Sequence, residues 1–286
     1  MRIALFRRVS SAEKCQGGGA RNRLKTASLT ATLRRAWVMI ASLVIFISFG
    51  QAYGADFQVQ PTTLDLGGGV KSGAFSVINN GNESINFQVA VKAWTQDSNG
   101  KDVYEDTKDI VFFPKIMTVG GNEQRAIRIG VKTPPAQKEK TYRLFIEEIP
   151  SAKKQISLAE GKINAGITIA FRFATPIFIK PLKEQEGAVV EQMDMSKGVV
   201  TARVRNTGTV HVKLLNVTFA GKAADGKELF SKEVAGWYVL HGVAVPYETK
   251  IPKEVCDSLA TIEVRAKTEK LNFAGNMNVQ KSMCAQ

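Results

Sequence analysis

The sequence contains few of the side chains that hold metals or perform nucleophilic catalysis, with three cysteines and two histidines among 286 residues. The histidines, His211 and His241, do not lie at metal-ligand spacing from a cysteine. The sequence also lacks a Gly-x-Ser-x-Gly elbow, an HExxH helix motif and a Cys-His pair. We therefore expect no enzyme activity, no metal, no cofactor and no small-molecule substrate.

Two segments resemble catalytic motifs only superficially. Gly221–Lys227 has the glycine and lysine spacing of a phosphate-binding loop, but Glu228 stands where a Ser or Thr must bind magnesium, and no helical pattern follows. We predict a hairpin turn there. Glu147 and Glu148 are adjacent in an expected strand, so their side chains point to opposite faces and cannot act together on one substrate.

Basic charge is concentrated near the N-terminus. The formal net charge is +13, from 39 Lys+Arg and 26 Asp+Glu, and residues 1–54 hold nine of the basic and one of the acidic residues. The remainder has 39 − 9 = 30 basic and 26 − 1 = 25 acidic residues, a net charge of +5. No basic run interleaved with aromatic residues is left after residue 54, so nucleic acid is not an expected partner.

The apolar run Ala36–Gly50 follows Arg34 and Arg35 and is shorter than the about 20 residues that span a membrane. Small residues in Ala52–Gly54 then suit signal peptidase, so we expect residues 1–54 to be a signal peptide cleaved after Gly54. An uncleaved anchor is the alternative. Residues 1–32 exceed an ordinary charged leader, which suggests an over-extended start codon.

Export predicts an oxidising environment for Cys256 and Cys284, the two cysteines outside this leader. An even pair in one domain predicts a disulfide joining the last strands, with a stabilisation of about 3 kcal/mol. A metal site is the alternative reading.

Short strands separated by turn residues fill the rest of the sequence. For residues 55–181 we expect strands at Phe57–Leu66, Ala74–Ile78, Ile85–Trp94, Ile110–Thr118, Arg125–Val131, Tyr142–Ile149 and Ile163–Ile179. For residues 182–286 we expect strands at Gly198–Asn206, Val212–Ala220, Lys227–Val234, Val243–Ile251, Leu259–Lys267 and Met277–Met283. This pattern predicts an all-β protein of two consecutive immunoglobulin-like β-sandwich domains.

The segment Ile163–Phe173 has the longest strict alternation of apolar and other residues. Its apolar row is Ile163, Ala165, Ile167, Ile169, Phe171 and Phe173. A period of two predicts a strand with one apolar face. That face either covers a sandwich core or lies on an open edge and is offered to another protein.

Several motifs occur in the order found in PapD-like periplasmic pilus chaperones. They are Val59–Pro61, Asn79–Gly81, Gln88–Val89, Val111–Pro114, Gln124 with Arg128, Tyr142–Pro150 and Pro176–Pro181. Residues 59–181 therefore resemble this family; the C-terminal part resembles it only in size, β character and its late cysteine pair.

The resemblance implies two domains in a boomerang arrangement, located in the periplasm. Family members bind, fold and cap pilus or fimbrial subunits by donor-strand complementation, a form of strand addition, and deliver them to an outer-membrane usher. Here the apolar row Ile163–Phe173 would be the donor strand. A self-capping homodimer is a further expectation.

The resemblance also implies an anchor for the subunit's terminal carboxylate. The expected first strand has no Lys or Arg, and Pro176 stands at the position of the family's lysine. Arg143 and Arg172 are then the expected anchor, which is similar to the non-classical, archaic branch. The alternative is that both are solvated surface arginines.

Two other classes of function remain open on sequence grounds. One is a secreted β-sandwich pilus subunit or adhesin, and the other is an exported carbohydrate-binding module or enzyme. A subunit would lack a complete final strand, whereas the final strand here is expected to be long.

Overall fold

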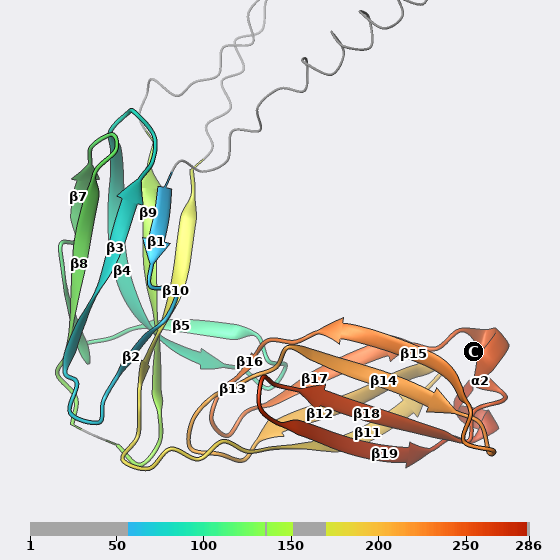
Figure 1. Cartoon of the computed structure of the whole chain (residues 1–286). Coiled ribbons are helices and arrows are strands. Elements are labelled where there is room, and N and C mark those ends of the chain that lie inside the picture. Colours follow the sequence, from blue (N-terminus) through green and yellow to red (C-terminus); the bar gives the residue numbers. More distant parts are fainter. Residues whose placement is uncertain (1–56, 135, 151–169, 285–286) are drawn as a thin grey trace, which may run out of the picture. The chain divides into compact units, whose positions relative to one another are not determined.

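The computed structural model describes residues 57–134, 136–150 and 170–284. Residues 55–286 form one compact unit. Its regular structure is almost entirely β, and the strands separate into an N-terminal set, β1 to β10, and a C-terminal set, β11 to β19 (Figure 1). This confirms the prediction of an all-β, two-sandwich immunoglobulin-like protein.

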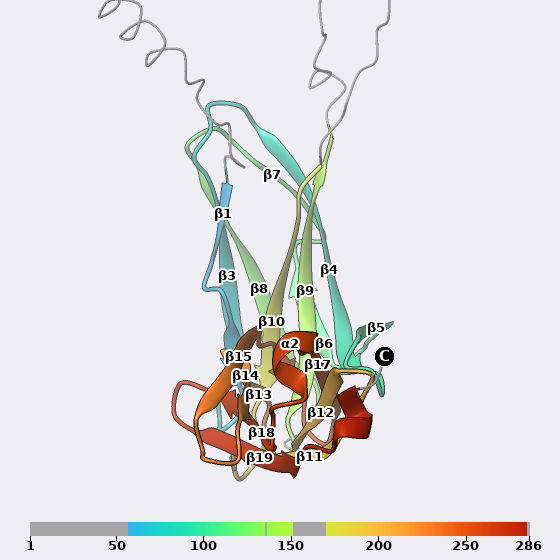
Figure 2. The ribbon, with the colours of Figure 1, turned by 90° about the vertical axis from the view of Figure 1, so that its right-hand side faces the viewer.

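The N-terminal set forms two facing sheets, which Figure 2 shows as two layers. One has the order β1 (Phe57–Gln60), β3 (Ser72–Asn79), β8 (Gln124–Val131) and β6 (Ile110–Phe113). The other has the order β2 (Leu64–Leu66), β10 (Arg172–Ile179), β9 (Lys140–Ile149), β4 (Ile85–Gln96) and β5 (Asp102–Asp106), and β7 (Ile116–Val119) also pairs with β4. We call these the first and second sheets.

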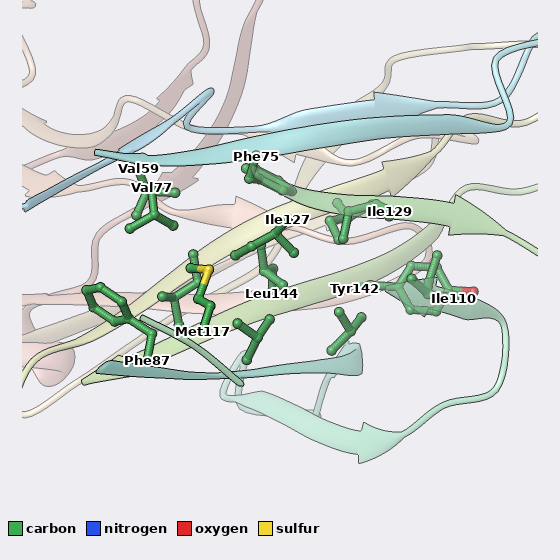
Figure 3. Packing of buried hydrophobic residues seen from close by; sticks show 14 of the residues in the cluster. Val59, Phe75, Val77, Phe87, Ile110, Met117, Ile127, Ile129, Tyr142 and Leu144 are labelled. Carbon is green, nitrogen blue, oxygen red and sulfur yellow. The ribbon is translucent and has the colours of Figure 1, made fainter. Parts of the chain in front are cut away.

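Alternation along these strands places one apolar row from each sheet in a shared core. Phe75 on β3 and Ile127 on β8 face Leu144 on β9 and Phe87 on β4, and all four are fully buried (Figure 3). Each large apolar side chain contributes about 1.5–3 kcal/mol when buried from water. This core fixes which faces of β9 and β10 point outward.

Within the described residues, the C-terminal set forms three sheets around its own core. The sheets are β11 (Ala188–Ser196), β12 (Val199–Asn206) and β17 (Ala244–Lys250); β13 (Val212–Lys213) and β16 (Tyr238–Val239); and β15 (Glu228–Ala235), β14 (Asn216–Lys222), β18 (Thr261–Lys267) and β19 (Asn272–Asn278). The short helix α2 (Lys253–Cys256) and the 3-10 turn η2 (Lys281–Cys284) complete this part.

Three expected strands are each divided in two. The expected Val212–Ala220 consists of β13 and β14, which belong to different sheets. The expected Phe57–Leu66 consists of β1 in the first sheet and β2 in the second, and the expected Ile110–Thr118 consists of β6 and β7, also in different sheets. Pro61 and Pro114 lie at the divisions of these last two. Proline has no backbone N–H for a sheet ladder, so a strand that changes sheets tolerates it there.

Three strands were missed and one was misplaced. No sequence pattern predicted β5, β11 or the two-residue β16. The charged and polar residues of β5 and β11 hide their alternation because both strands lie on sheet edges. The expected strand Met277–Met283 was wrong over most of its length, since β19 ends at Asn278 and Lys281–Cys284 is the 3-10 turn.

The predicted disulfide between Cys256 and Cys284 is confirmed, so these two thiols are bonded to each other. Their Cα atoms are 5.8 Å apart, and both residues are buried. The bond joins α2 to η2 and not two strands, which corrects that part of the prediction.

The phosphate-loop-like segment is a hairpin turn, as predicted. It connects β14 to β15, where the Ala223 N–H donates to the Lys227 carbonyl, and Gly226 adopts a positive φ of 85°. In residues 57–134, 136–150 and 170–284, no helix is long and apolar enough to cross a membrane.

Candidate functional site

Strand β10 has an open edge over most of its length. It pairs with β9 from Arg172 to Ile179, but on its other side β2 pairs only with Ile177–Ile179. Residues 172–176 therefore pair with no strand on that side within the part of the chain that the structure describes. Residues 172–174 are exposed, whereas Thr175 and Pro176 are buried and Thr175 Oγ1 donates to the Thr62 carbonyl. An open edge is a template for the backbone of another strand.

The predicted donor row leads directly into β10, so its last residues lie at this edge. Ile163, Ala165, Ile167 and Ile169 lie outside the described residues. Phe171 and Phe173 are each 38% exposed, and their rings lie 6.4 and 5.1 Å from the ring of Phe57. These two side chains thus contact β1 at the end of the core while keeping surface open.

The outer face of the second sheet carries both predicted anchor arginines. On β9 and β10, Arg143 is opposite Pro176 and Arg172 is opposite Glu147, so the four side chains share the face that points away from the core. Phe145 lies between the two arginines on this face.

Arg143 is enclosed by aromatic rings. Its side chain is 5% exposed, and its guanidinium carbon lies 3.8 Å from the ring centre of Trp94 and 5.7 and 5.6 Å from those of Trp237 and Tyr238. A cation over an aromatic face is stabilised electrostatically. The alternative of a solvated surface arginine is therefore wrong for Arg143.

The hydrogen-bonding capacity of Arg143 is largely unused. Nη1 donates a long hydrogen bond of 3.4 Å to the Ala174 carbonyl, whereas the buried Nε and Nη2 have no hydrogen-bond partner among the described residues. The Asp102 carboxylate lies nearby, with Oδ2 4.0 Å from Nη2, which is an ion pair without a hydrogen bond. Two adjacent N–H groups on one side of the guanidinium suit a carboxylate.

Arg172 is placed differently. It is exposed, its Nε lies 2.6 Å from Glu147 Oε1, and its guanidinium lies 4.2 Å above the ring of Phe145. It is opposite Glu147, four positions from Arg143 on β9, which is about 13 Å along a strand. The two arginines share a face but have separate partners.

The β4–β5 hairpin supplies the polar surroundings of Asp102. Tyr104 Oη donates to Asp102 Oδ2 at 3.1 Å, and Gln96 Nε2 donates to Asp102 Oδ1 at 3.2 Å. Burial, and then the charge of Asp102, raise the pKa of the Tyr104 hydroxyl. The hydroxyl therefore stays protonated at neutral pH and serves as a donor.

The same face is in contact with the C-terminal set of strands. Trp94 and Phe178 form a buried cluster with Tyr238 and Leu240. Gln96 joins the two sets as well, since its Nε2 donates to the Tyr238 carbonyl at 2.9 Å and its Oε1 accepts from the Leu240 N–H at 3.0 Å.

No local sequence signal marks Trp94, Asp102, Trp237 or Tyr238 as functional. These positions are far apart in the chain, and only strand pairing and packing bring them together. In the described ranges, no group of three or more His, Cys, Asp or Glu side chains could hold a metal ion.

These features define a two-sandwich immunoglobulin-like protein with an open strand edge in its N-terminal part. Residues 56–184 match the family of pili and flagellar-assembly chaperones, PapD N-terminal domain. The N-terminal part of the chain, residues 56–184, therefore belongs to this family.

Solved structures share the fold across most of the chain. One is the CsuC-CsuE chaperone-tip adhesion subunit pre-assembly complex from archaic chaperone-usher Csu pili of Acinetobacter baumannii, with 18% identity, a TM-score of 0.54, and coverage of 76% of this chain and 97% of that chain. Another is the class 5 fimbriae chaperone CfaA, with 12% identity, a TM-score of 0.50, and coverage of 78% of this chain and 100% of that chain. No curated protein matches the sequence.

Proposed function

We propose that this protein is a periplasmic chaperone, without enzyme activity, that binds, folds and caps pilus subunits by donor-strand complementation and delivers them to an outer-membrane usher. The observation that carries the proposal is the unpaired, exposed edge of β10 at residues 172–174, which continues the apolar alternation of Ile163–Phe173. Membership of the PapD-like family supports the chaperone role.

The binding step follows from strand addition. A subunit that lacks one strand of its own sandwich gains backbone hydrogen bonds from the open edge, and the apolar row fills the groove left by the missing strand. At about 1.5–3 kcal/mol for each large side chain buried, several such residues offset much of the cost of ordering both partners. The capped subunit cannot polymerise early, and a second chaperone copy would cap the row in the same way.

A pilus subunit is the less favoured alternative. Subunits that need a donor lack a final strand, whereas β10 pairs with β9 along all eight of its residues. No observation on the described residues favours a carbohydrate-binding module.

A periplasmic location requires that the chain be exported. We expect the mature protein to begin at or near Ala55, because the apolar leader is short and ends in small residues. N-terminal sequencing of protein recovered from the periplasm measures this. Recovery of the full-length chain from the membrane fraction would contradict it.

The carboxylate anchor gives a test of the subunit-binding face. Arg143→Ala and Arg172→Ala are each expected to weaken subunit capture, because a charge-assisted hydrogen bond shielded from water contributes about 1.5–3 kcal/mol. We expect the larger loss at Arg143, whose Nε and Nη2 have no hydrogen-bond partner among the described residues. The measurement is the yield of soluble complex with the co-expressed subunit.

Two control variants distinguish a loss of carboxylate binding from a loss of folding stability. Arg143→Lys keeps the charge but loses the paired N–H geometry, so it should also weaken capture. The exposed Arg128 on β8 lies on the other sheet, and Arg128→Ala should leave capture unchanged. Normal capture by both Arg143 variants, with unchanged melting temperatures, would place the anchor elsewhere.

A further inference from the structure

We propose that Asp102 is a positioning residue for carboxylate capture: it compensates the charge of Arg143 in the free chaperone and competes with the subunit's terminal carboxylate. The inference rests on the proposed function, because it needs Arg143 to be the anchor. The ligand class is a chain-terminal carboxylate at the end of an extended peptide.

Asp102 places a negative charge near Arg143 but accepts no hydrogen bond from it. Its side chain is 19% exposed, and Oδ2 is 4.0 Å from Arg143 Nη2, beyond hydrogen-bond distance. Its two oxygens instead accept from Tyr104 Oη and Gln96 Nε2. Asp102 therefore stabilises a buried cation while leaving Nε and Nη2 unbonded.

This arrangement lets Arg143 bind a carboxylate, but the charge of Asp102 limits the affinity. Nε and Nη2 are buried and have no hydrogen-bond partner in the described residues, so an arriving carboxylate can accept two parallel hydrogen bonds from them once the groups that cover them move aside. It must then lie close to the negative charge of Asp102, and like charges in a shielded site repel. A chaperone has to release its subunit at the usher, and this repulsion keeps the anchored state reversible.

Asp102 lies at the start of β5, an edge strand, and is linked through Gln96 to the C-terminal strands. Gln96 binds both Asp102 and the backbone of Tyr238 and Leu240. Movement of Asp102 on capture therefore also alters a contact with the C-terminal strands.

The test uses two synthetic hexapeptides of alternating valine and threonine, one with a free C-terminal carboxylate and one amidated. The ratio of their dissociation constants, measured by calorimetry on the mature protein, reports carboxylate recognition alone. For Asp102→Asn we expect the preference for the free carboxylate to rise about fivefold, because the competing charge is gone. Asp106→Asn is the matched control, since Asp106 is exposed on the same strand and pairs with Lys92, and should leave the ratio unchanged.

A second variant gives the opposite expectation. Tyr104→Phe removes the hydroxyl that holds Oδ2, which lets Asp102 turn onto Arg143, so the preference should fall. Tyr104 is exposed, so this variant keeps the fold even if Asp102→Asn does not.

The outcomes separate the two proposals. A wild-type preference that neither variant changes overturns the role of Asp102 and leaves the Arg143 anchor intact. A preference absent from the wild type but present in Asp102→Asn supports the inference in its strongest form. No preference in any of the proteins overturns the anchor, and the role of Asp102 with it.

Discussion

Replacing Ile167 by glutamate is expected to abolish the soluble complex with the cognate subunit while leaving the melting temperature of the free chaperone unchanged. Ile167 lies outside the described residues, and the prediction rests on its place in the apolar row Ile163–Phe173. If that row fills a dry groove in the subunit, the new carboxylate would be buried without a partner, at a cost of several kcal/mol. Ile169→Glu should act in the same way.

The chain offers a matched control for this experiment. Thr168 lies between the two isoleucines and belongs to the opposite face of the alternation, so Thr168→Glu adds the same charge without entering the groove. Co-expression with the subunit, followed by measurement of soluble complex and of the chaperone's own melting curve, separates interface from core. Unfolding of the Ile167 variant would mean that the row is ordinary sandwich core.

Replacing Phe178 by alanine is expected to lower the free energy of unfolding by about 3–5 kcal/mol, the range for a large aromatic residue deleted from a core. Phe178 lies on the outer face of the second sheet, yet it is fully buried. Its ring stacks on His211 at 3.7 Å and lies 5.8 Å from the ring of Tyr238, both from the C-terminal part. The stability lost in this variant therefore comes from the contact between the N-terminal and C-terminal sets of strands.

Urea denaturation of the mature protein measures this effect, with Leu182→Ala as the control. Leu182 follows β10 closely and is exposed, so its truncation should change the unfolding free energy by less than about 0.5 kcal/mol. A loss below about 1 kcal/mol for Phe178→Ala would show that the contact between the sets contributes little to stability. An effect of the expected size identifies the outer face of the second sheet as part of the folded core.

The same contact explains how Arg143 is held buried. A buried cation is costly unless rings, hydrogen bonds and an opposite charge compensate it. Trp94 and Tyr238 supply the rings and Asp102 supplies the charge, but the hydrogen bonds remain incomplete. An incomplete set of hydrogen bonds in a buried site is what a ligand can complete.

Local sequence signals were sufficient for the architecture and the disulfide. The period of two and the turn residues predicted most of the strands in both sandwiches, because alternation and turn chemistry depend on neighbouring residues only. The edge strands β5 and β11 were not predicted, because a strand at a solvated edge does not need an apolar row. The divisions at Pro61 and Pro114 were not predicted either, because alternation does not reveal which sheet a strand joins.

The sequence by itself determined the two β-sandwiches, the Cys256–Cys284 pair and the apolar alternation that ends in β10. Only the tertiary structure decided that β10 has an open edge at residues 172–174 and that Arg143 is enclosed while Arg172 is exposed. The physical reason is that both arginines sit in similar local sequence, on the outward face of neighbouring strands. What distinguishes them is Trp94, Trp237 and Tyr238, which come from distant parts of the chain and meet only when the strands pair and pack.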